Sequence, residues 1–484
     1  MSDERNTATV SDVLDDLGKT PILEKLADVE VPEPLKEEAP PEDMAHRQFE
    51  DGRFWKHIPR FKDVSEEEFL DHRFQNKNSV TSLEQLTEVI EDLVDADFLE
   101  DVKAGLSQAP MNMRLSPYVL SLIDWDRPYR DPIRIQFIPV ASQRLPNHPR
   151  LTLDSLHEQK DSPTPGLVHR YPDKALFLPI DVCPVYCRFC TRSYAIGGDT
   201  GTVDKVQYRP QQKRWEKAFA YIASRPELED IVISGGDMYM MPANKLEQVA
   251  MTLLAIPHVR RIRFASKGAA VMPMKILSDT KWTDAMCRVV DKGRELHKEV
   301  CLHTHFNSSA EITDITRRAM NHLFERGVQV RNQSVLIRHV NDSTTEMTSL
   351  IKQLSYMNVQ PYYVYQHDMV MGVEDLRTTV GHTVELERHV RGATAGFNTP
   401  TFVNDVPGGG GKRDVHSYDH YDPTTGVSVY RSPVVDDNRV FLYFDPLHLL
   451  PEEGQQRWAD EAEHDQIVRE AIEAAGHDPE TVKI

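Results

Sequence analysis

The sequence predicts an α/β protein built on a parallel (β/α) barrel that is closed in part or in full. Three observations lead to this fold class: short apolar runs follow one another after Tyr171, amphipathic helical patterns separate them, and the alternation continues to about residue 403. Strands that alternate with helices form parallel sheets with right-handed crossovers, and six or seven such units favour a barrel. The predicted strands are residues 175–180, 231–233, 262–265, 300–306, 328–337, 360–366 and 401–403.

Amphipathic patterns predict the helices of this barrel. Apolar residues recur at helical spacing in residues 213–224, 245–255, 312–325, 344–357 and 383–390. A last helical segment, residues 452–475, is expected to end at Gly476, because glycine readily adopts the left-handed conformation that ends many helices.

Four regions are expected along the chain. Residues 1–46 carry thirteen Asp/Glu against four Lys/Arg, a composition typical of an acidic, disordered extension with one short helix near residues 13–26. Residues 47–160 are expected to form a helical region and a proline-rich connector. Residues 161–412 form the barrel core, and residues 413–484 form a C-terminal extension that we expect to take part in oligomerisation.

Charge and composition exclude several classes of protein. The net charge of −20 argues against a nucleic-acid partner, since clustered Lys and Arg would be needed to neutralise phosphates. No run approaches the roughly 18 apolar residues of a membrane span, and no secretory signal follows the N-terminus. We therefore expect a cytoplasmic protein with no membrane partner. Five cysteines in so long a chain do not suggest a disulfide framework.

Unusual residues follow the predicted strands one after another. In a (β/α) barrel, the loops at the carboxyl ends of the strands carry the chemistry. Caps and turns also gather at strand ends, but seven such positions in succession favour a functional site. In strand order they are Cys183, Gly235 to Asp237, Lys267, His305, Asn332 with Gln333, Asp368, and residues 405–412.

Three of the five cysteines lie within eight residues, at Cys183, Cys187 and Cys190. Soft thiolate ligands select iron–sulfur clusters, and three of them leave one iron of a [4Fe–4S] cluster open to a small molecule. The spacing C-x3-C-x2-C is typical of radical S-adenosylmethionine (SAM) enzymes, in which SAM occupies that iron. The alternatives are an incomplete zinc site or a chance cluster, although zinc sites usually show paired C-x2-C modules. Cys287 and Cys301 are expected to be ordinary buried cysteines.

Two glycine motifs extend this interpretation. Gly235, Gly236 and Asp237 resemble the element of radical SAM enzymes that holds the amino group of SAM, although such a turn alone is a weak signal. Residues 408–411 are four glycines followed by Lys412, and a backbone without side chains can approach a ligand closely. A lysine presented in this way can form a Schiff base with pyridoxal phosphate (PLP). The motif is not a P-loop, and a flexible surface loop is the alternative.

From about residue 55 to residue 433 the chain resembles the lysine 2,3-aminomutase family. The matching stretches occur in one order along nearly the whole predicted core. They are residues 118–124, 131–134, 161–173, 187–192, 233–237, 303–307, 332–336, 340–342 and 361–363, and the loop that ends at Lys412. The resemblance implies a barrel of the radical SAM type, with a [4Fe–4S] cluster, SAM and PLP as cofactors. It also implies an isomerase that interconverts L-lysine and β-lysine by moving an amino group between C2 and C3.

The resemblance assigns cofactor-binding roles to matched residues. Lys412 would hold PLP and act in catalysis, and Arg170 would lie against the PLP phosphate. Lys174 stands where the family has a second arginine, and it keeps the charge but not the planar fork. Gly235, Gly236 and Asp237 would contact SAM. His305 and Gln333 complete the residues that we expect to contact a cofactor.

The resemblance also assigns substrate-binding roles. Arg192 would bind the substrate carboxylate, for which its planar guanidinium is suited. Asp368 and Asp405 match two carboxylates that receive the distant ammonium of lysine, and charge complementarity favours a cationic side chain there. Ordinary ion pairs, or carboxylates that only hold turns, are the alternatives for these residues.

Other assignments stay open. The nearest alternative is the same chemistry on arginine, glutamate or a protein-borne lysine, although relatives that act on glutamate are thought to lack the acidic pair. A radical SAM enzyme that modifies nucleic acids is disfavoured by the acidic charge, and a non-catalytic iron–sulfur sensor would not need PLP. We also expect a one-electron reductant such as flavodoxin or ferredoxin as a partner, and a homo-oligomer.

Besides Lys174, the chain departs from the family pattern at further places, and the acidic N-terminal extension, residues 1–46, is additional. Ser193 and Tyr194 replace a more basic run, and residues 264–273 differ from the usual loop that contains Arg-Thr-Pro. No cysteine follows Lys412, so the C-terminal zinc site of some relatives cannot form with thiolates. These changes bear on substrate choice or assembly.

Overall fold

The computed structural model describes residues 26, 29–30 and 41–484, and the chain divides into two units, Met1–Ala45 and His46–Ile484. The helix expected near residues 13–26 and most of the acidic extension lie outside the described residues. The fold described below is that of the unit His46–Ile484. The expected boundaries at residues 160 and 412 inside this unit stay predictions.

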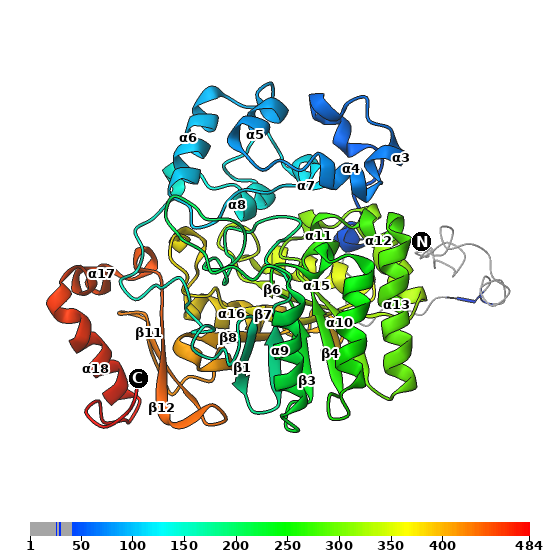
Figure 1. Cartoon of the computed structure of the whole chain (residues 1–484). Coiled ribbons are helices and arrows are strands. Elements are labelled where there is room, and N and C mark those ends of the chain that lie inside the picture. The colour runs from blue at the N-terminus through cyan, green and yellow to red at the C-terminus, as the bar shows by residue number, and fades with distance from the viewer. Residues whose placement is uncertain (1–25, 27–28, 31–40) are drawn as a thin grey trace. The chain divides into compact units, whose positions relative to one another are not determined.

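A nine-stranded, mostly parallel sheet forms a nearly closed barrel, with the strands in the order β1 to β9 (Figure 1). Strands β2 to β8 run parallel, whereas β1 and β9 pair antiparallel with their neighbours at the two edges. All seven predicted strands are present, so the expected (β/α) barrel is confirmed. The strands are β1 Leu167–Tyr171, β2 Lys174–Phe177, β3 Asp230–Ile233, β4 Arg261–Ala265, β5 Glu299–Thr304, β6 Gln329–Val335, β7 Val359–Tyr365, β8 Thr401–Val406 and β9 Gly411–Asp414.

Helices join the parallel strands and cover the sheet from outside (Figure 1). Buried apolar side chains of these helices and of the strands form one large core. Five of the helices match the predicted ranges, and α13 contains Cys287, which the sequence places in a helical pattern. Trp282, Met286 and Val289 recur at helical spacing on the buried face of α13. The helices are α9 Gln212–Ala223, α10 Ala243–Ala255, α11 Gly268–Val271, α12 Met274–Ser278, α13 Thr280–Glu295, α14 Asp314–Glu325, α15 Thr344–Tyr356 and α16 Val380–Val390.

Six short helices precede the barrel and lie together on one side of it (Figure 1). The last of them contacts the loops beyond the strands: the Gln136 carbonyl accepts from the Arg188 amide at 2.9 Å, and its side chain accepts from Asn307 at 3.0 Å. This region therefore helps to hold the loops that carry the predicted site. The helices are α3 Glu66–Phe69, α4 His72–Lys77, α5 Leu83–Ile90, α6 Ala96–Ser107, α7 Pro117–Leu122 and α8 Pro132–Phe137.

The C-terminal region adds a small antiparallel sheet that the sequence analysis did not predict. Helix α18 packs on this sheet, and the buried side chains of both belong to a second core cluster. The single helix predicted for residues 452–475 is wrong, because extended backbone at Asp460 breaks it, and the Asp460 carboxylate caps the next turn by accepting from Ala462 at 3.0 Å. The elements are β10 His420–Asp422, β11 Val427–Ser432, β12 Asp436–Phe444, α17 Glu452–Ala459 and α18 His464–Ala474.

Helix α18 stops just before Gly476, whose φ of 81° is the left-handed conformation expected there. None of the helices in the described part of the chain has the length and apolar character that a membrane crossing requires.

Candidate active site

A cavity of about 470 Å³ lies inside the barrel and reaches the loops after its strands. All fourteen residues to which the sequence analysis assigned a role line this one cavity, although they are spread over more than 240 positions of the chain. They are Arg170, Lys174, Cys183, Cys187, Cys190, Arg192, Gly235, Gly236, Asp237, His305, Gln333, Asp368, Asp405 and Lys412. Asn332, noted as a strand-end residue, does not line it. The structure therefore brings the predicted site together, while the role of each residue stays a prediction.

The three clustered cysteines lie on the loop after β2, and all are free thiols at the cavity wall. Arg188 anchors this loop: its guanidinium donates to both carboxylate oxygens of Asp375, at 3.0 and 2.9 Å, and to the Ile135 carbonyl at 3.0 Å. Burial raises the pKa of all three thiols above the ordinary value. Deprotonated ligands at this wall therefore need a strong positive partner such as a metal cluster.

The donor chemistry of these thiols fits a cluster. A [4Fe–4S] cluster takes each thiolate on a different iron, so three soft donors facing one cavity fit it. Within residues 41–484 and the few described before them, no three His, Cys, Asp or Glu side chains already converge as ligands of one ion.

Gly235 and Gly236 are in close backbone contact with residues 180 and 182, at the start of the loop that carries the three cysteines (the cysteine loop). A Cβ at Gly235, whose φ is 110°, would lie 2.1 Å from the Ile180 carbonyl oxygen, and one at Gly236 would lie 2.5 Å from backbone atoms of Val182. The Asp237 carboxylate accepts from the amides of Tyr239 and Lys267, both at 2.8 Å. These residues bind the ends of two strands to the cysteine loop.

Lys412 lies on β9, the second strand of the hairpin that β8 and β9 form. Asp405 and Lys412 are paired residues of the two strands, and Lys412 Nζ donates to Asp405 Oδ2 at 2.9 Å. A Cβ at Gly410 would lie 2.6 Å from the Phe441 ring, and one at Gly411 2.3 Å from the Tyr171 hydroxyl. The glycines are therefore required by packing, and the loop is a tight turn.

Two carboxylates, Asp368 and Asp405, lie at the same cavity wall but differ in their surroundings. Thr191 donates to Asp368 Oδ2 at 2.7 Å, while Asp368 Oδ1 and Asp405 Oδ1 are buried without a hydrogen-bond partner. Burial, and next the charge of Asp405, raise the pKa of Asp368 to about 7. Burial acts the same way on Asp405, but Lys412 and Arg170 outweigh it and lower the pKa of Asp405.

The basic residues of the cavity are all held by acidic neighbours. Arg170 Nε donates to Asp161 at 2.8 Å, and Arg170 Nη1 lies 3.7 Å from Asp405. Lys174 Nζ donates to Asp173 at 2.8 Å and lies over the Tyr171 ring. Arg192 forms a two-pronged ion pair with Glu158, a residue that the sequence analysis did not single out.

His305 directly follows β5 and Gln333 lies on β6, and both line the cavity. The His305 ring stacks on Phe189, its Nε2 atom is buried without a partner, and burial lowers its pKa well below the ordinary value. Gln333 accepts from the Tyr365 hydroxyl at 3.3 Å. A neutral imidazole nitrogen without a protein partner is suited to contact a bound molecule.

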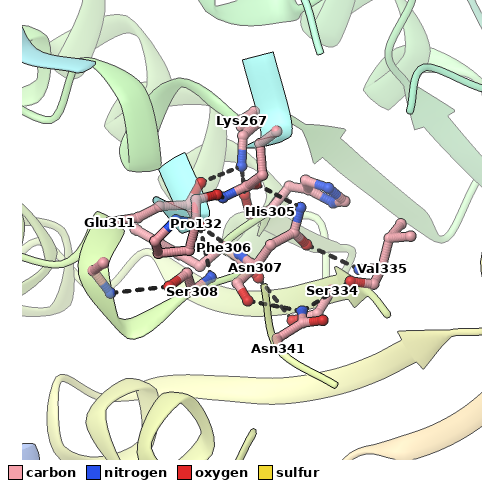
Figure 2. Close-up of polar contacts among 12 residues, drawn as sticks. Pro132, Lys267, His305, Phe306, Asn307, Ser308, Glu311, Ser334, Val335 and Asn341 are labelled. Carbon is pink, nitrogen blue, oxygen red and sulfur yellow. Dashed lines mark hydrogen bonds and ion pairs between the residues drawn. The ribbon is translucent and has the colours of Figure 1, made fainter. Parts of the chain in front are cut away.

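A connected set of buried polar side chains joins the ends of β4, β5 and β6, and we call it the strand-end lattice (Figure 2). Of its members, Lys267 lines the cavity and the others lie behind it. Lys267 Nζ donates to Glu311 at 2.6 Å and to the His305 carbonyl at 2.9 Å. Asn307 accepts from the Val335 amide at 2.9 Å, and Asn341 donates to the carbonyls of Asn307 and Val335. The lattice consists of Lys267, Asn307, Glu311, Asn332, Ser334 and Asn341.

Glu158 and Glu311 were missed by the sequence analysis. Each carboxylate partners a cationic side chain 34 or 44 positions away, so no local spacing marks it. Lys267 was noted only as a residue after a strand. A charged residue in a polar loop cannot be recognised from the sequence as buried and paired, because its partner lies far away along the chain.

Comparisons with known proteins agree with this geometry. No family model matches the chain. An L-lysine 2,3-aminomutase of Fusobacterium nucleatum is 39% identical over 73% of this chain and 78% of its own length. An L-lysine 2,3-aminomutase of Clostridium subterminale is 38% identical over 73% of this chain and 80% of its own. A glutamate 2,3-aminomutase of Clostridioides difficile is 29% identical over 72% of this chain and 77% of its own.

Proposed function

Since the chain belongs to the lysine 2,3-aminomutase family, whose members are radical SAM iron–sulfur isomerases, we propose that it interconverts L-lysine and β-lysine. The family reaction moves an amino group between C2 and C3 of an amino acid. Lysine as the substrate is supported by the sequence identities: relatives named L-lysine 2,3-aminomutase are 37 to 39% identical to this chain, whereas the glutamate 2,3-aminomutase is 29% identical.

The observation that carries this proposal is that Asp405 already binds a primary ammonium, that of Lys412. Lys412 Nζ, itself a primary ammonium, lies 2.9 Å from Asp405 Oδ2, and Asp368 offers a second carboxylate at the same wall with a free oxygen. Two carboxylates at one wall suit a cationic side chain and repel a carboxylate. The cavity therefore favours lysine over glutamate.

The donor sets fit three cofactors. Cys183, Cys187 and Cys190 would hold the [4Fe–4S] cluster, and Gly235 to Asp237 would contact SAM beside it. Lys412 and Arg170 would hold PLP by its carbonyl carbon and its phosphate, with Lys174 nearby. When bound, the cluster and SAM supply a radical that removes hydrogen from C3, and PLP supplies the π-system that lets nitrogen migrate.

The chain's own residues bind, orient and move protons. Lys412 must lose a proton before its amine can attack a carbonyl carbon, and Asp405 Oδ2 at 2.9 Å is the nearest acceptor. The charge of Asp405 outweighs burial and raises the pKa of Lys412, and Lys412 in turn lowers the pKa of Asp405, so the proton stays on Lys412 until a bound molecule changes this ion pair. Arg192 would orient the substrate by its carboxylate.

The test is an anaerobic incubation of reconstituted protein with SAM, PLP, dithionite and L-lysine, followed by chromatography for β-lysine. Arginine and glutamate are run in parallel. We expect β-lysine from the wild type and none from Lys412→Ala or Cys187→Ala. Deoxyadenosine without β-lysine would keep the radical chemistry and reject lysine as the substrate.

Arginine is the second candidate substrate, because a guanidinium also complements the carboxylate pair of Asp368 and Asp405. A β-amino product from arginine alone would assign the chain to that substrate. A bound cluster with no product and no PLP absorbance would support the sensor alternative. We further propose a flavodoxin or ferredoxin as the reductant, and a homo-oligomer that involves residues 413–484.

A further inference from the structure

Glu158 holds the guanidinium of Arg192 from the side. Arg192 Nε donates to Glu158 Oε2 at 2.8 Å, and Arg192 Nη2 donates to Glu158 Oε1 at 2.6 Å. The Glu158 side chain is 5% exposed and that of Arg192 is 22% exposed, and both residues line the cavity. Burial opposes the charge of Arg192, but Glu158 outweighs it and raises the pKa of Arg192.

The side-on pair leaves one edge of the guanidinium unused. A guanidinium carries five N–H groups, of which Glu158 takes one on Nε and one on Nη2. Across the described residues, the remaining N–H groups of Arg192 donate to no protein atom. Two of them are on Nη1 and one is on Nη2, so the edge between these nitrogens can hold a carboxylate with two parallel hydrogen bonds.

Tyr194 completes the surroundings of Glu158. Its hydroxyl donates to Glu158 Oε2 at 3.0 Å, and its ring is buried in a small apolar cluster with Val168, Leu178 and Tyr208. Tyr194 stands where the family pattern has a more basic run. In this chain a buried tyrosine holds the carboxylate that holds Arg192.

The chain segment around Glu158 also holds the other predicted anchors. The Ser155 carbonyl accepts from the Gly408 amide at 2.9 Å, so the segment is bonded to the turn before Lys412. Asp161 binds Arg170 at 2.8 Å, and the Leu156 carbonyl accepts from the same guanidinium. The Asp154 carboxylate accepts from the Glu158 amide at 2.9 Å and fixes the backbone from which Glu158 extends.

We propose that Glu158, supported by Tyr194, is a positioning residue that fixes the edge of Arg192 presented to the substrate carboxylate. This inference rests on the proposed role of Arg192. The expected consequence lies in alignment more than in affinity. Without the Glu158 charge, Arg192 attracts a carboxylate more strongly but in a less defined orientation, and small errors in the placement of C3 cost turnover.

The test compares Glu158→Gln with the wild type under saturating SAM, PLP and dithionite. The amide keeps the size of the side chain but offers only one acceptor, so Arg192 loses one prong. We expect kcat for β-lysine formation to fall at least about tenfold while KM for lysine changes less than about threefold. We also expect the ratio of released deoxyadenosine to β-lysine to rise at least about fivefold, because SAM cleavage continues while migration fails.

A matched control exists on the surface. Arg288 donates to Glu247 at 2.9 and 2.8 Å in the same two-pronged geometry, but the pair does not line the cavity. Glu247→Gln makes the same chemical change and should leave kcat, KM and the ratio within about twofold, as expected for an exposed pair. Tyr194→Phe removes one hydrogen bond from Glu158 and should raise the ratio by a smaller amount than Glu158→Gln. If Glu158→Gln fails to fold, Tyr194→Phe carries the test.

Two results would overturn the inference while leaving the proposed function in place. In one, an active wild type and Glu158→Gln share the same kcat and ratio. In the other, deoxyadenosine and β-lysine fall in parallel, which marks a loss of folded enzyme. A wild type that forms no β-amino acid from any amino acid would instead reject the proposed function.

Discussion

The strand-end lattice and the cavity wall that holds Asp368 and Asp405 both contain buried polar residues, but they differ in how completely these are hydrogen-bonded. In the lattice, each side-chain oxygen and nitrogen of its six residues has a protein partner, and Figure 2 shows part of this set. At the wall formed by β7, β8 and the hairpin, one oxygen each of Asp368 and Asp405 is buried without a partner.

The difference separates scaffold from binding surface. A buried polar group that lacks a partner costs free energy, so it persists where a ligand supplies the missing bond. A fully paired lattice has no such capacity and instead fixes the ends of three strands. The fold therefore concentrates its paired polar groups in the lattice. It leaves unpaired carboxylate oxygens at the cavity wall that holds Asp368, Asp405 and Lys412, which we call the open wall.

Lys412→Ala should give the largest loss of activity, because it acts at the centre of the open wall. The proposed attachment of PLP is lost, and we expect β-lysine formation to fall by at least about 10³-fold. Chromatographic assay measures the product, and near-ultraviolet absorbance measures bound PLP. A variant that retains more than a tenth of the activity would contradict the role given to Lys412.

Glu311→Gln should break the lattice and reduce stability. The Lys267 and Glu311 side chains are 8% and 2% exposed, so the change leaves a buried ammonium without a counter-charge. Removing one partner of such a pair costs about 3 to 5 kcal/mol. Differential scanning calorimetry should show a lower unfolding temperature, with Glu247→Gln as the control at an exposed pair. An unchanged unfolding temperature would mean that the lattice is not a scaffold.

Asp368→Asn should weaken substrate binding without lowering stability, in contrast to Glu311→Gln. We expect KM for lysine to rise about tenfold, because one of the two charges proposed to receive its ammonium is lost. Stability at about pH 8 should be equal or higher: the folded pKa of about 7 lies above the unfolded value, so ionisation of Asp368 destabilises the fold as pH rises. A lower unfolding temperature with unchanged KM would reassign Asp368 to the scaffold.

The parallel strands could be predicted from sequence because strands buried on both faces read as continuous apolar runs. The strands β1 and β9 could not, since Arg170, Lys412 and Arg413 give them the composition of loops. The break at Asp460 was missed because residues 455–475 contain no Gly or Pro to mark a helix end, and its cause is one capping carboxylate.

The open wall was more predictable than the scaffold. Lys412 and the cysteines belong to local motifs, and Asp368 follows a predicted strand and matches a residue of the family. The lattice and Glu158 depend on partners that only the fold brings close. Contacts between residues far apart in the chain leave no spacing to find.

The smallest expected effect is the pH dependence of lysine binding, and it tests the open wall in the wild type. Asp368 binds an ammonium well only when ionised, and its pKa is about 7. The ionised fraction then rises about fourfold between about pH 6.5 and about pH 8, so the part of KM that Asp368 controls should fall by about that factor. The α-amino group of the substrate lysine also titrates near this range, and it changes KM equally in the wild type and in the Asp368→Asn variant. Asp368→Asn removes only the carboxylate, so the ratio of the two KM values should follow the titration of Asp368. A ratio that does not vary with pH would mean that Asp368 is already ionised, or stays neutral, when substrate binds.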